Sequence, residues 1–153
     1  MKLPDQAATR RVGEVLSRIV EPGTTIALIG DLGAGKTTLV SGLVEALGGT
    51  ASSPTFSLVN EYPTRRFVVW HIDLYRLERE AELVELGLDD MIGNRVGICV
   101  IEWADKFDVL PADHLRLELV HDGSARSLTM TGTGPRGELL ASTLESELLG
   151  SGG

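Results

Sequence analysis

Residues 30–37 read GDLGAGKT, and this stretch decides the fold. The letters satisfy the pattern G-x-x-x-x-G-K-[ST], in which glycines let the backbone curl so that successive N–H groups face inward. A helix that begins at the end of such a turn adds partial positive charge at its N-terminus. The stretch therefore predicts an anion-binding turn between a buried strand and a helix.

The segments on either side of this turn have the patterns that it requires. Residues 24–29 form a short apolar run rich in β-branched side chains, which predicts a strand buried on both faces. Residues 39–47 carry apolar side chains at helical spacing, and two glycines end that helix. Before the strand, Asp5 is expected to cap a helix over residues 5–20. We therefore expect the order helix, strand, loop, helix.

The rest of the chain is predicted from alternation, helical spacing and turn residues. A hairpin is expected over residues 56–62 and 66–73, a helix over 77–88 and a strand over 97–102. A second hairpin is expected over residues 115–120 and 127–131, and a terminal helix over 136–149. In the helix over 77–88, the side chains expected to face inward are Leu77, Ala81, Val84 and Leu88. The expected fold is α/β, a P-loop NTPase three-layer α/β/α sandwich, whose mixed sheet is parallel around the loop and carries antiparallel hairpins toward its edges. One domain over residues 1–149 and a flexible tail over 150–153 are expected.

The composition narrows the class of protein. The 153 residues are 42% hydrophobic and 24% charged, which is typical of a globular chain. No apolar run approaches the ~18 residues that span a bilayer, and residues 1–5 lack a signal-peptide core, so we expect a cytoplasmic protein with no membrane partner. The single cysteine, Cys99, excludes an internal disulfide and any cysteine-based metal cluster. The formal net charge of −8 repels a phosphate backbone and disfavours a protein that grips nucleic acid alone.

The loop and two strand ends supply the candidate chemistry. We expect Lys36 to contact the β- and γ-phosphates of a nucleotide and the Thr37 hydroxyl to bind octahedral Mg²⁺. Asp73 and Glu102 each end a predicted strand, where P-loop enzymes place a second magnesium-side carboxylate. Each alone could also be a helix cap or a surface acid. We favour both as metal or water ligands, with Glu102 as the more direct ligand.

Four further residues are weighed against simpler roles. Thr55 follows the loop helix where nucleotide-sensing switch segments lie, and its hydroxyl is expected near the γ-phosphate or its metal, the alternative being a plain loop. Trp103 is expected to stack on the nucleotide or a partner, the alternative being core or rim packing. Arg126 is a candidate cover for the base or phosphates, the alternative being a solvated surface charge. His71 is interpreted as a strand residue that faces solvent or a neighbour rather than as a catalytic base.

The candidate residues fall into three groups. The catalytic candidates are Lys36, Thr55, Asp73 and Glu102. The metal candidates are Thr37, Asp73 and Glu102. The nucleotide-binding candidates are Leu32, Gly33, Ala34, Gly35, Lys36, Thr37, Thr38, Trp103 and Arg126.

Four motifs in one order resemble a known family. They are GDLGAGKTT at 30–38, SPTFSLVNEY at 53–62, HIDLYRL at 71–77 and EW at 102–103. The chain is similar to the bacterial ATPases of tRNA threonylcarbamoyladenosine biosynthesis, the TsaE (YjeE) family, from its first predicted helix to about residue 132. Lys36 and Thr37 match the family's loop residues, and Thr55 matches its switch threonine. Asp73 and Glu102 match its magnesium-side acids, and Trp103 matches its tryptophan near the nucleotide.

The resemblance implies an ATPase that binds and hydrolyses ATP with Mg²⁺. It implies a complex with the threonylcarbamoyl transferase and its inactive paralogue, in which nucleotide turnover supports threonylcarbamoyladenosine modification at position 37 of ANN-decoding tRNAs. Hydrolysis is expected to be weak alone and stimulated by the partners, and tRNA to be contacted only indirectly through the complex. The chain departs from the family pattern at its start, where an opening strand would be short or absent, and at its glycine-rich end.

The loop alone leaves other classes of protein open. A GTPase is disfavoured because the guanine-reading Asn-Lys-x-Asp motif is missing, and the nearest trace, at residues 105–108, reads DKFD. A small-molecule kinase would need a lid of arginines, for which the candidates are Arg65, Arg66, Arg76 and Arg79. A nucleotide-gated binding module would order its switch loop around bound ATP with negligible turnover.

Overall fold

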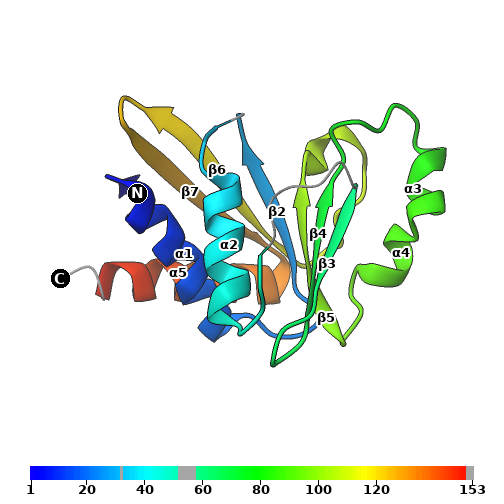
Figure 1. Cartoon of the computed structure of the whole chain (residues 1–153), viewed down its shortest axis with the longest axis horizontal. Coiled ribbons are helices and arrows are strands. Elements are labelled where there is room, and N and C mark those ends of the chain that lie inside the picture. Colours follow the sequence, from blue (N-terminus) through cyan, green and yellow to red (C-terminus); the bar gives the residue numbers. More distant parts are fainter. Residues whose placement is uncertain (32, 52–57, 151–153) are drawn as a thin grey trace.

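We describe residues 1–31, 33–51 and 58–150 of a computed structural model (Figure 1). In this part of the chain, one sheet contains seven strands in the order β1-β7-β6-β2-β5-β4-β3. The strands are β1 (Lys2–Leu3), β2 (Thr25–Gly30), β3 (Val59–Tyr62), β4 (Val68–Asp73), β5 (Gly97–Glu102), β6 (His114–Asp122) and β7 (Ala125–Thr133). The helices are α1 (Gln6–Ile19), α2 (Lys36–Ala46), α3 (Ala81–Leu86), α4 (Leu88–Met91) and α5 (Gly134–Gly150), with a short 3₁₀ turn, η1 (Ala104–Lys106).

The central strands of the sheet are parallel and the outer pairs are antiparallel. β6, β2, β5 and β4 run in the same direction. β3 pairs antiparallel with β4, and β7 pairs antiparallel with both β6 and β1. The expected mixed sheet, with a hairpin toward each edge, is therefore confirmed. Residues 56 and 57, which the sequence assigns to the first hairpin, lie outside the described residues.

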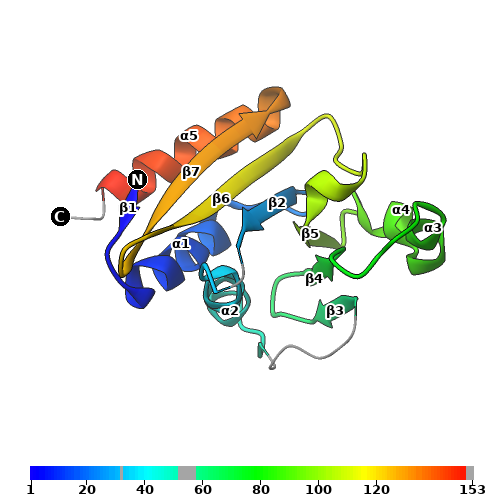
Figure 2. The same ribbon diagram turned by 90° about the horizontal axis from the view of Figure 1, so that it is seen from above.

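Two apolar cores separate three layers. In the first core, Leu43 of α2 and Leu144 of α5 pack with one face of the sheet. In the second core, Leu83 of α3 packs with the opposite face. Because side chains alternate along a strand, Val100 of β5 joins the first core and its neighbour Ile101 joins the second. Figure 2 shows β2, β5 and β4 between α1 and α2 on one side and α3 and α4 on the other, which confirms the three-layer sandwich.

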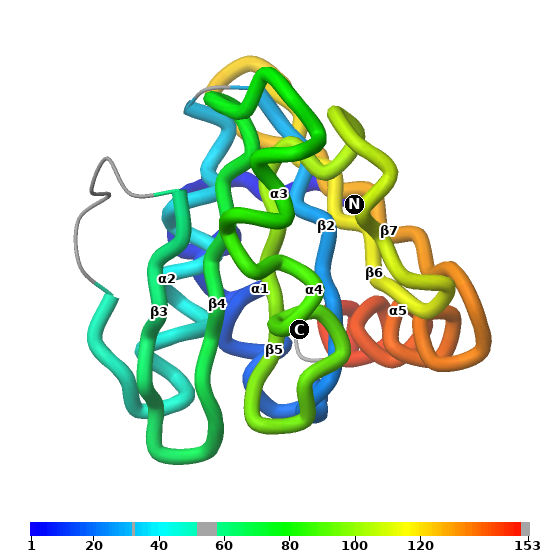
Figure 3. Tube along the Cα trace, turned by 90° about the vertical axis from the view of Figure 1, so that its right-hand side faces the viewer, coloured from blue at the N-terminus to red at the C-terminus, as the bar shows by residue number. Residues whose placement is uncertain are grey.

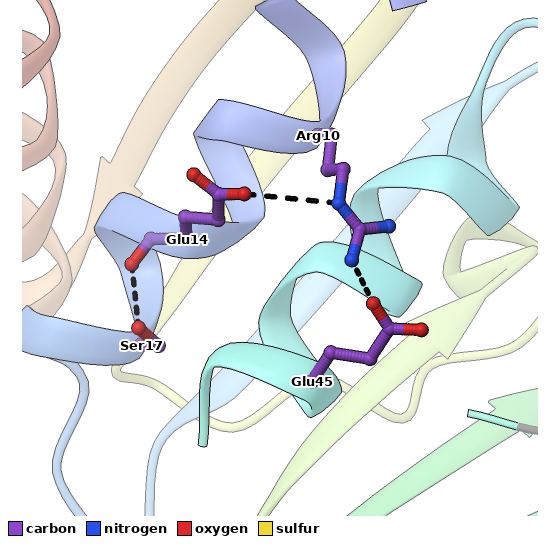
Figure 4. Close-up of polar contacts among 4 residues, drawn as sticks. All are labelled: Arg10, Glu14, Ser17 and Glu45. Carbon is purple, nitrogen blue, oxygen red and sulfur yellow. Dashed lines mark hydrogen bonds and ion pairs between the residues drawn. The ribbon is translucent and has the colours of Figure 1, made fainter. Parts of the chain in front are cut away.

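Helices α1 and α2 pack at close range and hold the loop helix in place. A Cβ on Gly13 of α1 would overlap the carbonyl oxygen of Leu39 in α2, so only glycine permits this approach. Figure 4 shows Arg10 of α1 between two carboxylates. Its Nε lies 3.7 Å from Glu14 Oε1, and its Nη2 pairs with Glu45 of α2. The sequence predicts one helix before β2 and one after it along the chain, and α1 and α2 confirm both.

The predicted helix over residues 77–88 is wrong in its start and its continuity, and its inward face is correct for only two of the four expected residues. The helix begins at Ala81, and Gly87, with a left-handed φ of 72°, separates α3 from α4. Leu77 and Leu88 are buried as expected. Ala81 and Val84 are instead exposed, Val84 to 77%, and Leu83 packs inward. The left-handed glycine changes the direction of the chain, so one helical period cannot run through the whole segment.

The opening strand is short, as the sequence indicates. β1 has two residues and pairs with β7, which places Leu3 opposite Arg126. At the other end, α5 covers the predicted helix over 136–149 and ends at Gly150, while residues 151–153 lie outside the described part of the chain. The division into one domain and a flexible tail stays a prediction. Among the described residues, no helix is both long and apolar enough to cross a membrane.

Candidate nucleotide-binding site

A cavity of about 920 Å³ lies at the carboxyl ends of the parallel strands. Figure 3 shows the segments that follow β2, β4 and β5 at one end of the molecule, together with the β6–β7 turn. Ligands of open α/β sheets bind at this edge. The candidate residues that line the cavity are Gly33, Gly35, Lys36, Thr37, Thr38, Asp73, Glu102, Trp103 and Arg126. Ala34 is fully buried beside it, and Leu32 and Thr55 lie outside the described residues.

The turn between β2 and α2 has the geometry of an anion-binding turn. Gly33 and Gly35 have left-handed φ values of 77° and 105°, which glycine adopts without steric cost. A Cβ on Gly35 would also lie 3.2 Å from Cγ2 of Thr9 in α1. Because α2 begins at Lys36, its unpaired N–H groups and the positive end of its dipole lie at this turn. Both features favour a phosphate group there.

Lys36, Glu102 and His71 form a cluster on the cavity wall. The Nζ atom of Lys36 lies 3.2 Å from Oε1 of Glu102, and Nε2 of His71 lies 2.5 Å from Oε2 of the same carboxylate. The three side chains are only 10%, 11% and 13% exposed for lysine, glutamate and histidine. Burial raises the pKa of Glu102, but the hydrogen bond and charge of His71, followed by those of Lys36, outweigh burial and lower this pKa below its usual value. Glu102 is therefore held as an ionised carboxylate between two nitrogen atoms.

Asp73 lies beside Glu102 at the end of the neighbouring strand. The two residues are directly opposite each other in the β4–β5 register. Oδ1 of Asp73 accepts a hydrogen bond from the N–H of Tyr75 at 3.0 Å, which fixes the turn after β4. The structure thus brings the two predicted acids together, and Thr37 lines the same cavity. Their roles as metal ligands stay predictions.

The oxygen atoms around the cavity suit Mg²⁺ in kind. Thr37, Asp73 and Glu102 supply hydroxyl and carboxylate oxygens, which are the protein ligands that Mg²⁺ prefers. Within residues 1–31, 33–51 and 58–150, no group of three or more His, Cys, Asp or Glu side chains could hold a metal ion by itself. A magnesium ion at this site would therefore depend on phosphate and water for most of its ligands. Direct ligation by Glu102 Oε1 also requires Lys36 to find another anion.

Trp103 lies at the exit of β5 in a conformation that is rare for its residue type. Its φ of 60° is left-handed, and no other non-glycine residue in the described part of the chain has a positive φ. Its ring centroid lies 5.0 Å from that of Tyr75, and Nζ of Lys36 lies 5.3 Å from it. The residue is 40% exposed and lines the cavity, so it packs at the rim rather than in a core. Stacking on a nucleotide stays a prediction.

Arg126 reaches the loop from β7. Its Nε donates to the carbonyl of Ala34 at 3.2 Å, its Nη2 to the carbonyl of Gly33 at 3.1 Å, and its Nη1 to the carbonyl of Ala125 at 2.8 Å. The alternative interpretation of Arg126 as a solvated surface charge is therefore wrong. A direct contact with the base or phosphates stays a prediction.

Sequence reasoning did not assign His71 and Tyr75 to this site. His71 does face a neighbour, but that neighbour is the candidate ligand Glu102. The sequence did contain a signal for His71, because the two predicted strands that end at Asp73 and Glu102 can be aligned as parallel neighbours. In that alignment His71, two residues before Asp73, lies on the same face of the sheet as Glu102. The ring contact of Tyr75 with Trp103 depends on two exit loops, and no local pattern indicates it.

The parallel sheet, the turn at its carboxyl edge and the helix that follows define an α/β protein with a P-loop NTPase-like fold. The structure is similar to the crystal structure of YdiB from Bacillus subtilis, with a TM-score of 0.81 and 30% sequence identity, over 96% of this chain and 93% of that chain. The sequence model of a family described as "Threonylcarbamoyl adenosine biosynthesis protein TsaE" matches residues 3–128, and the chain belongs to this family. The expected family is thereby confirmed.

Relatives in the same family align over most of their length. A protein of Bacillus subtilis (strain 168), named tRNA threonylcarbamoyladenosine biosynthesis protein TsaE, is 37% identical over 140 residues, which cover 89% of this chain and 87% of the relative. A protein of the same name from Nostoc sp. (strain PCC 7120) is 39% identical over 135 residues, which cover 84% of this chain and 83% of the relative. The likeness therefore extends well beyond the loop.

Proposed function

We propose that the chain is a magnesium-dependent ATPase that supports threonylcarbamoyladenosine modification of tRNA, as a subunit of a complex with the threonylcarbamoyl transferase and its inactive paralogue. Membership of a family named for threonylcarbamoyl adenosine biosynthesis supports the pathway. One structural observation supports nucleotide chemistry above all others. A buried lysine at the start of α2 is paired with an ionised carboxylate at the end of β5, in a cavity that the anion-binding turn also lines.

Lys36 exchanges partners in this proposal. A triphosphate carries more charge than one carboxylate and also meets the N–H groups of the turn, so it competes successfully with Glu102 for the ammonium group. Glu102 is then free on Oε1 while His71 still holds Oε2, which leaves an oriented oxygen for a water molecule or a metal ion. Thr37, Asp73 and Glu102 would hold Mg²⁺, which supplies neutralisation of charge on the phosphate oxygens.

The charge of the chain supports indirect contact with tRNA. The formal net charge is −8, so the surface as a whole repels a nucleic-acid backbone. We therefore assign the modification reaction and the direct binding of tRNA to the partner proteins. Isolated P-loop proteins commonly need groups from a partner for fast turnover, which is the physical reason to expect weak hydrolysis alone.

Phosphate release with and without the transferase pair tests the proposal. We expect a low rate for the isolated chain and a rise of at least tenfold with the pair, and no release in either condition from Lys36→Ala. Equal rates with and without the pair would contradict stimulation. Absence of both ATP binding and phosphate release in every condition would end the ATPase proposal. Nucleoside analysis of tRNA from cells depleted of the protein should show loss of threonylcarbamoyladenosine.

The competing functions have less support. Among the described residues that line the cavity, none is one of the four arginines suggested as a kinase lid, namely Arg65, Arg66, Arg76 and Arg79. Arg66 instead donates to the carbonyl of Ser17 at 2.7 Å. A nucleotide-gated binding module differs from an ATPase in rate alone, so binding of ATP without phosphate release in the complete complex would favour it.

A further inference from the structure

We infer that Arg126 is a positioning residue that shapes the phosphate-binding loop, so that the N–H groups of the loop are aligned before phosphate arrives. This inference rests on the proposed function, because it concerns the same cavity. It assigns to Arg126 a contact with the loop itself rather than with the nucleotide.

The guanidinium of Arg126 holds two consecutive carbonyls of the turn. Nη2 donates to the carbonyl of Gly33 at 3.1 Å, and Nε donates to that of Ala34 at 3.2 Å. The guanidinium is planar and its N–H groups point in fixed directions, so both carbonyls must face the same side. An ammonium group is a single point donor and cannot impose that arrangement.

Fixing a carbonyl also fixes the amide that follows it. The C=O and N–H of a trans peptide point in opposite directions, and the described ranges contain no cis peptide bond. Since the carbonyl of Gly33 faces Arg126, the N–H of Ala34 points away, and it closes the turn by donating to the carbonyl of Asp31 at 3.0 Å. Since the carbonyl of Ala34 also faces Arg126, the N–H of Gly35 points away from the guanidinium, and Gly35 lines the cavity.

The loop needs such a constraint, and Arg126 is well placed to supply it. Glycine has more backbone freedom than any other residue type. Aligning the peptide groups of Gly33 and Gly35 therefore carries a large entropic cost unless another element holds them. Arg126 is itself fixed on both sides, because β1 pairs Leu3 with it and β6 pairs His121 with it. Its Nη1 also donates to the carbonyl of Ala125 at 2.8 Å.

Two variants of Arg126 and one matched control test the inference. Arg126→Met removes the charge and the donors, and Arg126→Lys keeps the charge but loses the planar fork. Arg79→Met removes the same charge from a side chain that is 83% exposed and does not line the cavity. Arg126→Lys keeps the experiment decisive should Arg126→Met fail to fold.

The first measurement is amide hydrogen exchange in nucleotide-free protein, followed by NMR. In both Arg126 variants the amide of Ala34, which donates to the carbonyl of Asp31 at 3.0 Å, should exchange about tenfold faster than in the wild type, since hydrogen bonds to a charged donor are worth at least that factor. Amides of β2 and β5 should keep their rates, and Arg79→Met should match the wild type throughout. Wild-type exchange at the loop in Arg126→Met would overturn the inference.

The second measurement is calorimetric affinity for ADP and for ATP with Mg²⁺. Both affinities should fall by the same factor, about tenfold, in Arg126→Met, because a misaligned loop harms every phosphate chain equally. A much larger loss for ATP than for ADP, with unchanged exchange at the loop, would show a direct contact with the γ-phosphate and overturn the inference. Wild-type protein that binds neither nucleotide would contradict the proposed function, and the exchange rates would still decide the role of Arg126.

Discussion

Glu102→Gln keeps the shape of the side chain and removes the negative charge that contacts both Lys36 and His71. At the observed 3.2 Å, the attraction is about 5 kcal/mol at an effective dielectric constant of 20. Glutamine still accepts a hydrogen bond, which offsets part of this loss, and we expect a net destabilisation of about 2 kcal/mol from a buried lysine without a counter-charge. For a chain of 153 residues, this corresponds to a fall in Tm of about 4–8 °C.

The same substitution should have the opposite effect on nucleotide binding. Without Mg²⁺, the carboxylate of Glu102 only repels a triphosphate that contacts Lys36, so Glu102→Gln should then bind ATP as tightly as the wild type or up to about tenfold more tightly. Phosphate release should fall by about 100-fold or more.

Scanning calorimetry with and without ATP and Mg²⁺, together with phosphate release, measures these changes. The control is Asp105→Asn, which breaks an exposed ion pair with Arg116 and should shift Tm by about 2 °C at most. A wild-type Tm for nucleotide-free Glu102→Gln would refute the reasoning on the buried pair, and weakened binding of ATP without Mg²⁺ would refute the exchange of partners by Lys36.

Four other outcomes are expected. Lys36→Ala should lose measurable ATP binding in calorimetry, and wild-type heats would reject the loop assignment. Because the pKa of Glu102 is lowered in the folded protein, its ionised form stabilises the fold at any pH above the pKa of about 4.3 that glutamate has in the unfolded chain. This stabilisation is lost as the pH falls through the pKa of the folded state. The urea midpoint should therefore fall less between pH 7 and pH 3 in Glu102→Gln than in the wild type. Burial raises the pKa of Cys99 to about 12, so a thiol reagent at pH 8 should label native protein far more slowly than urea-unfolded protein, and similar rates would show that the thiol is accessible. Gly13→Ala should cost about 1–3 kcal/mol in urea unfolding because its Cβ overlaps the Leu39 carbonyl, and an unchanged midpoint would mean that α1 and α2 separate freely.

The parts of the fold that sequence reasoning predicted are those with local determinants. The pattern at residues 30–37 contains the glycines, the lysine and the hydroxyl that the turn requires, and apolar spacing beside it gives β2 and α2. Turn residues likewise indicate the two hairpins, one toward each edge of the sheet. Helix spacing failed over residues 77–88 because apolar side chains recur across Gly87, where the backbone becomes left-handed.

The contacts that decide the site join residues that are far apart in the chain. His71 meets Glu102 across 31 positions, and only the register of two parallel strands places them on one face. Arg126 donates a hydrogen bond to Gly33, which lies 93 residues earlier in the chain. No local pattern indicates that the β6–β7 hairpin extends as far as the loop. The chemical types of the candidate residues were therefore predictable, whereas their partners were not.

The two tryptophans have unlike surroundings. Trp70 is 8% exposed in the second core and donates from its indole to Glu61 at 2.9 Å, whereas Trp103 is 40% exposed beside Lys36. We therefore expect the intrinsic fluorescence of the unlabelled protein to combine a steady emission from Trp70 with an emission from Trp103 that responds to events at the cavity. A ligand that draws the ammonium group away from the Trp103 ring is expected to change the emission of Trp103, so that its arrival can be followed in real time by stopped-flow mixing.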